Sequence, residues 1–154
     1  MSEVVLLFAG SRKNGSPVQE EVVLERLGGD RFRVVQSPGL VLGIAAGDVI
    51  TVDGDRPTVV VRGGNLCVQI FSIADIARIE PVATERLRGL GGYLDGSAEK
   101  ELVFTLPLTA GWQNIERVLN EVVAQFPGAE WLYGNVYDAV DGVTPLNWWV
   151  KPTS

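Results

Sequence analysis

The stretch SPGLVLGIAAGDVITV, residues 37–52, decides between two kinds of fold, because its three glycines could cradle a phosphate or turn the chain between strands. A dinucleotide-binding loop has the pattern G-x-G-x-x-G at the start of a helix, and a P-loop has a lysine after its last glycine. Here Gly39, Gly43 and Gly47 are four residues apart, no lysine follows, and residues 49–52 alternate between two faces as in a strand. The stretch therefore predicts a turn that bends the chain into a small barrel, without a helix N-terminus to bind phosphate.

The sequence on either side of this turn predicts short strands throughout residues 1–65. Gly28 and Gly29 stand between two of the apolar runs, in the position that a tight hairpin requires. We expect the strands to form an all-β, barrel-like module, because closing a sheet removes its exposed edges. The predicted strands cover residues 3–8, 18–27, 30–35, 48–55 and 57–65.

From residue 66 onward the pattern changes to strands alternating with helices. One helix is predicted over residues 81–92, with Pro81 in its first turn, and another over residues 110–126, where apolar residues recur at helical spacing. Residues 72–79 fit neither pattern. This order is typical of a ferredoxin-like βαββαβ module. The predicted strands cover residues 66–71, 92–96, 101–108 and 130–138, and the tail 144–152 could add one more.

The predicted fold class is therefore α+β. A small N-terminal β-barrel-like module, residues 1–65, is expected to pack on a C-terminal ferredoxin-like module, residues 66–154. No long linker separates the two modules, so we expect one compact unit.

The composition excludes several classes of function. The chain has 154 residues, a net charge of −6 and no histidine, which removes histidine-based catalysis and histidine-containing metal sites. We expect neither a metal nor a cofactor, because no calcium-loop spacing of acids occurs. The acidic balance disfavours nucleic acid and favours a basic partner. Cys67 stands alone in an apolar strand, and neither a signal peptide nor a membrane-spanning run is present, so we expect a cytoplasmic protein.

Two acidic regions are candidates for binding a partner. The segment GNVYDAVDGVTPLNWWV, residues 134–150, combines aromatic and acidic residues, which suits an interface with a basic pocket. Adjacent tryptophans on a strand point to opposite faces, so one should pack inward and one outward, unless the N-terminal module covers both. The acidic hairpin turn at residues 95–101 could extend this surface. The predicted partner-binding residues are Tyr137, Asp138, Asp141, Trp148, Trp149, Asp95 and Glu99.

The order and spacing of several elements resemble a bacterial family known as domain of unknown function 4265. The resemblance covers most of the chain up to Phe126, with departures at Gly39, Asn65 and Gln69. The family supplies no catalytic residues. Small, acidic, histidine-poor proteins of this kind resemble immunity proteins encoded beside bacterial toxins. The elements that carry the resemblance are the acidic strand 21–27, the hairpin strand 29–34, Pro38, the stretch 43–49, the strand region 59–71 and the segment LRGLGGYLDG, residues 87–96.

Three functions remain after these exclusions. The first is an immunity protein, which binds a cognate toxin domain and occludes its active site with acidic and aromatic side chains. The second is a sensor without catalysis, which binds a small molecule or peptide in a cleft between the modules. The third is an enzyme that uses Glu21 and Glu25 on one strand face, although a solvated face also explains these residues. The sequence favours the first function and a protein that is not an enzyme.

Overall fold

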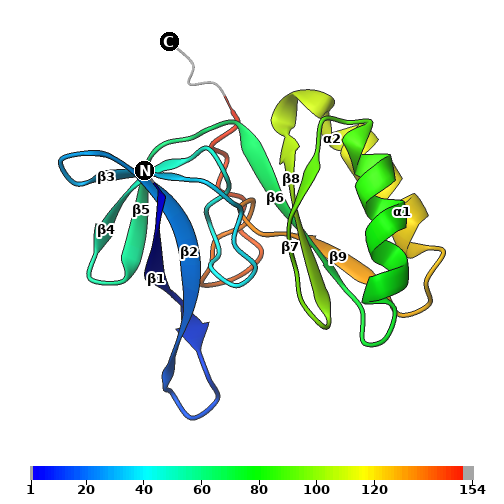
Figure 1. Ribbon diagram of the computed structural model, residues 1–154, viewed down its shortest axis with the longest axis horizontal. Coiled ribbons are helices and arrows are strands. Elements are labelled where there is room, and N and C mark those ends of the chain that lie inside the picture. The colour runs from blue at the N-terminus through cyan, green and yellow to red at the C-terminus, as the bar shows by residue number, and fades with distance from the viewer. Residues whose placement is uncertain (1, 151–154) are drawn as a thin grey trace.

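The computed structural model describes residues 2–150, which form two antiparallel sheets and two α-helices (Figure 1). The N-terminal half contains a five-stranded sheet, and the C-terminal half contains a four-stranded sheet with both helices on its outer side. The strands of the first sheet are β1 (Ser2–Ser11), β2 (Pro17–Gly28), β3 (Arg31–Val34), β4 (Val49–Asp53) and β5 (Arg56–Val61).

The first sheet is a meander in which each strand pairs with the next one along the chain. Gly28 and Gly29 have φ angles of 122° and 59° and form the predicted tight hairpin between β2 and β3. The apolar residues alternate along the strands, so they gather on one face of the sheet. The buried strand residues of this face are Leu7, Val22, Leu24, Val34 and Ile50.

The expected barrel is wrong, because the edge strands β1 and β5 do not pair. Among the described residues, a backbone hydrogen bond from Phe8 N to Asp55 O, at 2.7 Å, links β1 to the turn that precedes β5. The expectation rested on the need to remove exposed strand edges, but the sheet must also bury its apolar face. The loop 35–48 covers that face instead, where Val41 and Ile44 join the core of the first sheet. Burial is therefore achieved without closing the sheet.

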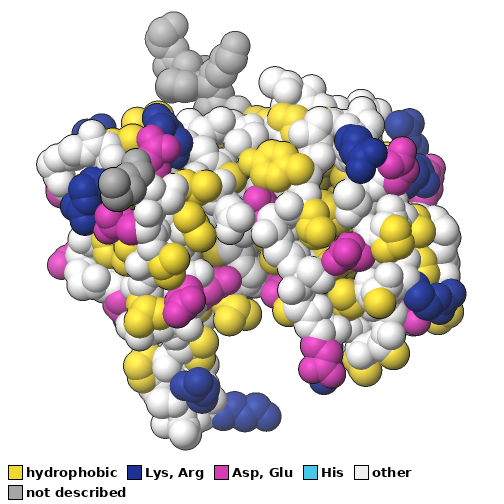
Figure 2. Space-filling view, viewed as in Figure 1, with side chains coloured by type: hydrophobic (Ala, Val, Ile, Leu, Met, Phe, Trp, Pro, Cys, Tyr) yellow, Lys and Arg dark blue, Asp and Glu magenta, His cyan; other side chains and the backbone are white. Residues whose placement is uncertain are grey.

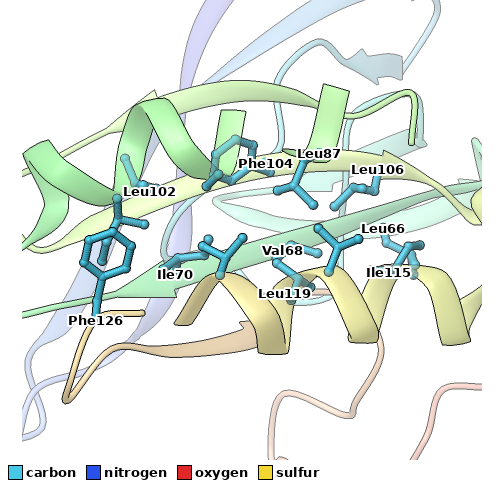
Figure 3. Packing of buried hydrophobic residues seen from close by; sticks show 14 of the residues in the cluster. Leu66, Val68, Ile70, Leu87, Leu102, Phe104, Leu106, Ile115, Leu119 and Phe126 are labelled. Atoms are coloured by element: carbon cyan, nitrogen blue, oxygen red, sulfur yellow. The ribbon is translucent and has the colours of Figure 1, made fainter. Parts of the chain in front are cut away.

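The second sheet has the spatial order β7-β8-β6-β9, and the helices α1 and α2 cover one of its faces. Figure 3 shows the core between sheet and helices, where Leu66, Val68 and Ile70 of β6 face Ile115 and Leu119 of α2. The elements of this half are β6 (Asn65–Phe71), α1 (Ile76–Arg88), β7 (Tyr93–Ser97), β8 (Glu101–Pro107), a 3-10 helix (Leu108–Ala110), α2 (Trp112–Val123) and β9 (Glu130–Tyr133).

The C-terminal half also corrects the expected ferredoxin-like module. The predicted order of strand, helix, strand, strand, helix and strand is present from β6 to β9. The sheet is not a separate layer under two helices, however, because its second face is buried as well. Cys67, Val103 and Thr105 on this face are 0%, 6% and 1% exposed. The loop 35–48 and the segment that follows β9 pack against it. The described chain is thus mostly antiparallel sheet, with nine strands in two sheets and two α-helices. The division into units 1–65 and 66–154 stays a prediction.

Helix α2 confirms the prediction from apolar spacing, because Ile115, Val118, Leu119 and Val122 are its buried residues. Helix α1 begins earlier than predicted, at Ile76, so Pro81 lies inside the helix rather than in its first turn. The extra turn forms because Ile76 and Ile79 continue the buried stripe of this helix. A proline removes one backbone donor, and this packing compensates for it.

The stretch 37–52 consists of a loop followed by strand β4, so the predicted turn is confirmed. The loop joins the two halves of the molecule. Gln69 Nε2 donates a hydrogen bond to Gly39 O at 2.9 Å, and Asn65 Nδ2 donates one to Ala46 O at 2.8 Å. Near the end of the loop, the backbone of Gly47 packs closely against that of Gly63. A Cβ added at Gly63 would lie only 2.4 Å from the carbonyl carbon of Gly47. Glycine at these two positions therefore allows the two backbones to pack closely.

Candidate functional site

A cleft of about 200 Å³ lies between the two halves, where β2 and the start of the joining loop face β7 and β8. Four acidic residues line it: Glu20 and Glu21 from β2, Asp95 from β7 and Glu101 from β8. Figure 2 shows Asp and Glu side chains beside the hollow between the halves. No lysine or arginine occurs among the described residues that line this acidic cleft. The cleft therefore concentrates negative charge without an adjacent cation.

Glu20 forms one wall of the acidic cleft by capping the joining loop. Its Oε2 accepts a hydrogen bond from Gly39 N at 2.8 Å, and its Oε1 accepts two more, from Leu40 N at 2.9 Å and Val41 N at 2.8 Å. Glu20 is half-buried and the next residue, Glu21, is exposed, as the alternation of a strand requires. Three backbone donors to one carboxylate fix the loop beside the cleft.

A chain of hydrogen bonds connects Asp95 to the same loop. Thr105 Oγ1 donates to Asp95 Oδ2, and Ser37 Oγ lies 2.6 Å from Thr105 Oγ1. Because the Thr105 proton is directed to Asp95, Ser37 is the donor to Thr105. Burial raises the pKa of Asp95 to about 6, although the hydrogen bond from Thr105 acts in the opposite direction. Asp95 therefore holds its proton more tightly than an exposed aspartate.

Glu101 faces Glu20 across the acidic cleft. Burial, and secondarily the negative charge of Glu20, raise the pKa of Glu101 to about 7. Its Oε1 lies so close to Gly39 that a Cβ there would be 2.7 Å away, and its Oε2 is buried without a hydrogen-bond partner in the described structure. A cationic group beside Glu101 would favour its ionised form and displace the proton. The arrangement is suited to binding a cation at neutral pH.

The remaining acids considered in the sequence lie outside the acidic cleft or have other partners. Glu99 is exposed in the turn between β7 and β8 and does not line the cleft. Glu25 Oε1 accepts a bond from Arg33 Nη1 at 3.1 Å, across the β2–β3 pair. Glu25 thus has a basic partner, whereas Glu21 lines the acidic cleft.

The predicted acids of the C-terminal segment stabilise a turn. Asp138 Oδ1 accepts a hydrogen bond from Val140 N at 2.7 Å, and Asp141 Oδ1 accepts bonds from Val143 N and Thr144 N, both at 2.9 Å. The side-chain hydrogen bond from Thr144, followed by these backbone bonds, lowers the pKa of Asp141. Hydrogen bonds to the backbone of the turn therefore explain the presence of both aspartates without a binding partner.

The adjacent tryptophans do not lie on a strand, so the expectation of opposite strand faces was based on a wrong element. In the described part of the tail, Tyr137 and Pro145 form one isolated bridge. Trp148 and Trp149 are both half-buried, with their rings edge to face at 5.5 Å. Arg62 of the N-terminal half lies over the Trp148 ring at 5.3 Å. Residues 151–152 of the predicted tail strand lie outside the described residues.

The predicted binding residues occupy different places around the second sheet. Asp95 lies on the edge strand β7, whereas Tyr137 and Trp149 follow the opposite edge strand, β9. Sequence reasoning assigned no role to Glu20 in the cleft and overlooked Ser37 and Thr105. Thr105 could have been found from the sequence, because it is a polar residue inside the apolar strand ELVFTLP. A buried hydroxyl group needs a hydrogen-bond partner, which indicates a polar contact at this position.

The described helices include none that is long and apolar enough to cross a membrane. Within residues 2–150, no group of three or more His, Cys, Asp or Glu side chains has a geometry that could hold a metal ion. The candidate site is therefore the acidic cleft with its hydrogen bonds, between the two sheets.

These features define the chain as a two-sheet protein with an acidic cleft between the sheets. It belongs to the family described as Domain of unknown function (DUF4265), whose model matches residues 20–128. That range includes the acidic cleft and ends before the C-terminal segment. No curated protein matches the chain. A hypothetical protein from Neisseria gonorrhoeae, known from a crystal structure, is similar in fold, with a TM-score of 0.67 and 12% identity over 87% of this chain and 94% of that one.

Proposed function

We propose that the chain is an immunity protein, which binds a cognate bacterial toxin domain and occludes its active site. The acidic cleft carries this proposal, because four carboxylates line it and no basic side chain does so among its described residues. A basic group of the toxin would enter the cleft and contact Glu101 and Asp95.

The energetics of the acidic cleft favour a cationic partner over an empty site. Ionising a half-buried carboxylate beside another one is unfavourable, and burial together with Glu20 raises the pKa of Glu101 to about 7 for this reason. A guanidinium or ammonium group in the cleft would supply the opposite charge and stabilise the ionised carboxylates. The net charge of −6 would attract a basic toxin surface over a longer range.

The proposed role is binding rather than catalysis. Glu20 already accepts three backbone hydrogen bonds, and Glu25 is paired with Arg33. Both side chains thus have structural partners that a reacting substrate would have to replace. The family adds no activity to this inference, since its description names none.

The test is co-purification of the tagged chain with the product of its adjacent gene. The proposal predicts a stoichiometric complex and protection of cells from that product. The variants Asp95→Asn and Glu101→Gln keep the side-chain shape and remove the charge, so together they should weaken binding at least tenfold. Glu85→Gln is the matched control, because Glu85 is exposed on α1, where it pairs with Arg88.

Two results would contradict the proposal. One is a chain that elutes alone and gives no protection. The other is a complex whose affinity is unchanged in the Asp95→Asn, Glu101→Gln double variant, since the toxin would then bind elsewhere. Raising the salt concentration provides a further check, because association steered by charge slows as ionic strength rises.

A further inference from the structure

A second pocket lies where α2, β9 and the C-terminal segment meet, on the opposite side of the second sheet from the acidic cleft. Its volume is about 180 Å³, and its walls are the aromatic side chains of Trp112, Tyr133, Tyr137 and Trp149, with Glu116 beside them. Pockets that enclose a drug-sized ligand have volumes of about 300–1,000 Å³. This aromatic pocket therefore suits one small group.

The aromatic rings of the pocket are in edge-to-face contact, with their planes at steep angles to one another. Trp112 and Tyr133 have centroids 5.4 Å apart and ring planes at 87°, and Trp112 and Trp149 have centroids 5.1 Å apart at 67°. Aromatic faces carry partial negative charge and attract cations, most strongly when several rings surround the same position. Tyr137, which also lines the pocket, is 41% exposed, so a ligand can reach this wall from solvent.

Glu116 adds a full negative charge to these walls. Its Oε2 accepts a hydrogen bond from the Tyr133 hydroxyl at 2.8 Å. Burial and the bond to Glu116 raise the pKa of Tyr133, so this phenol stays protonated and leaves the carboxylate as the charged member of the pair. No lysine or arginine is among the described lining residues that could neutralise it.

We propose that the aromatic pocket binds a methylated ammonium group, with its methyl groups against the rings and its charge beside Glu116. A bare ammonium or guanidinium group needs several hydrogen-bond acceptors. This pocket presents one carboxylate among aromatic rings, Val136 and Pro145, a surface that suits a cation whose donors are replaced by methyl groups. The inference uses no residue of the acidic cleft and does not depend on the proposed function.

The test compares choline with 3,3-dimethyl-1-butanol, which has the same shape and no charge. Both are titrated into the intact chain, and tryptophan fluorescence and the indole N–H signals of its NMR spectrum are followed. Choline should give saturable changes, and the uncharged analogue should bind at least tenfold more weakly. A trimethyllysine peptide, titrated in parallel, distinguishes the source of the group: tighter binding than choline indicates a protein ligand, and weaker binding a small molecule.

Two variants separate binding from folding. Glu116→Gln keeps an acceptor for Tyr133 and removes the charge, and Tyr137→Ala removes an exposed wall; each should weaken choline binding at least fivefold while the melting temperature changes little. Glu121→Gln, on the same helix and paired with Arg86, is the control that should bind choline as the natural chain does. Equal binding of choline and its carbon analogue, unchanged binding by Glu116→Gln, or no saturable signal with choline or the peptide would overturn the proposal.

Discussion

Asp48 is a single residue on which the junction between the loop and β5 depends. It is 1% exposed and accepts hydrogen bonds from Ala45 N at 2.9 Å and Gly63 N at 2.8 Å, with Arg62 Nη1 at 3.4 Å. Burial raises its pKa, although these partners act in the opposite direction. The carboxylate is thus stabilised by three donors from two segments, the joining loop and the residues that follow β5.

We predict that Asp48→Asn lowers the free energy of unfolding by about 2–3 kcal/mol, because an amide cannot accept from all three donors and places its own NH₂ beside one of them. Thermal denaturation should show a melting temperature lower by roughly 5–10 °C. Asp53→Asn at the exposed end of β4 is the control and should change the melting temperature little. A loss below about 0.5 kcal/mol would show that Asp48 is not a structural anchor.

Gly63 tests the close approach of two backbones. An added Cβ would lie 2.4 Å from the carbonyl carbon of Gly47 and 2.6 Å from its oxygen, and backbone atoms cannot rotate away. Gly63→Ala should therefore destabilise the chain by about 2–4 kcal/mol in a urea titration. Gly96→Ala, where a Cβ meets no atom within 4 Å, should stay within about 0.5 kcal/mol of the natural chain. Similar effects of the two variants would contradict the contact.

At the scale of elements, Pro81 offers the sharpest test. It is exposed in the middle of α1, where it provides no N–H for the helix ladder. Pro81→Ala should raise the free energy of unfolding by about 1–2 kcal/mol, since alanine restores the donor and favours the helix. The measurement is the urea midpoint, with Glu85→Ala on the same exposed side as control. A destabilised Pro81→Ala chain would mean that the proline fixes the helix start in a way that packing does not explain.

The elements themselves could be predicted from local sequence to different degrees. The strands of the first sheet and the hairpin at Gly28 followed from alternation and turn chemistry, and α2 followed from its apolar stripe. The start of α1 could not be predicted, because packing of Ile76 and Ile79 on the core outweighs the local signal of Pro81. The tryptophan pair was misplaced for a similar reason: contacts with Arg62 and Trp112 hold Trp148 and Trp149 in an irregular segment.

At the scale of the whole molecule, the sequence gives the number of acidic residues but does not show which of them lie together in the fold. The net charge was visible, and Asp95 was a candidate, yet the acidic cleft exists because residues from β2, β7 and β8 meet across the two sheets. Whether an apolar face is buried by closing a barrel or by folding a loop over it is also decided by contacts distant in sequence. Val41 and Ile44 in the loop 35–48 decided it here.

The acidic cleft makes stability depend on pH. Burial raises the pKa of Asp95 from 3.8 to about 6, and burial with the charge of Glu20 raises that of Glu101 from 4.5 to about 7. Between pH 3.8 and about pH 7 the folded chain binds more protons than the unfolded chain, so the free energy of unfolding falls as pH rises. The protonated acids contribute their full stabilisation below pH 3.8, and the contribution is lost as pH rises through about 6 and 7.

Urea titrations should therefore show that the free energy of unfolding falls by about 1–2 kcal/mol between pH 5 and pH 8. This is less than the two pKa shifts would give for fully buried groups, because both carboxyl groups contact solvent. The Asp95→Asn, Glu101→Gln double variant should show little of this slope and should be more stable than the natural chain at pH 8. A natural chain whose stability rises over this range would contradict the pKa shifts and the charged character of the cleft.

The same titration predicts how a partner should bind. A basic group in the acidic cleft stabilises the ionised acids, so the complex lowers the pKa values of Asp95 and Glu101 and releases protons. Affinity for a basic toxin should then increase from pH 5 to pH 7, in the range where the free chain loses stability. Isothermal titration calorimetry in buffers of different ionisation enthalpy measures this proton release directly. Binding without proton release at pH 6 would place the toxin outside the cleft, whereas release that disappears in the double variant would assign it to these two residues.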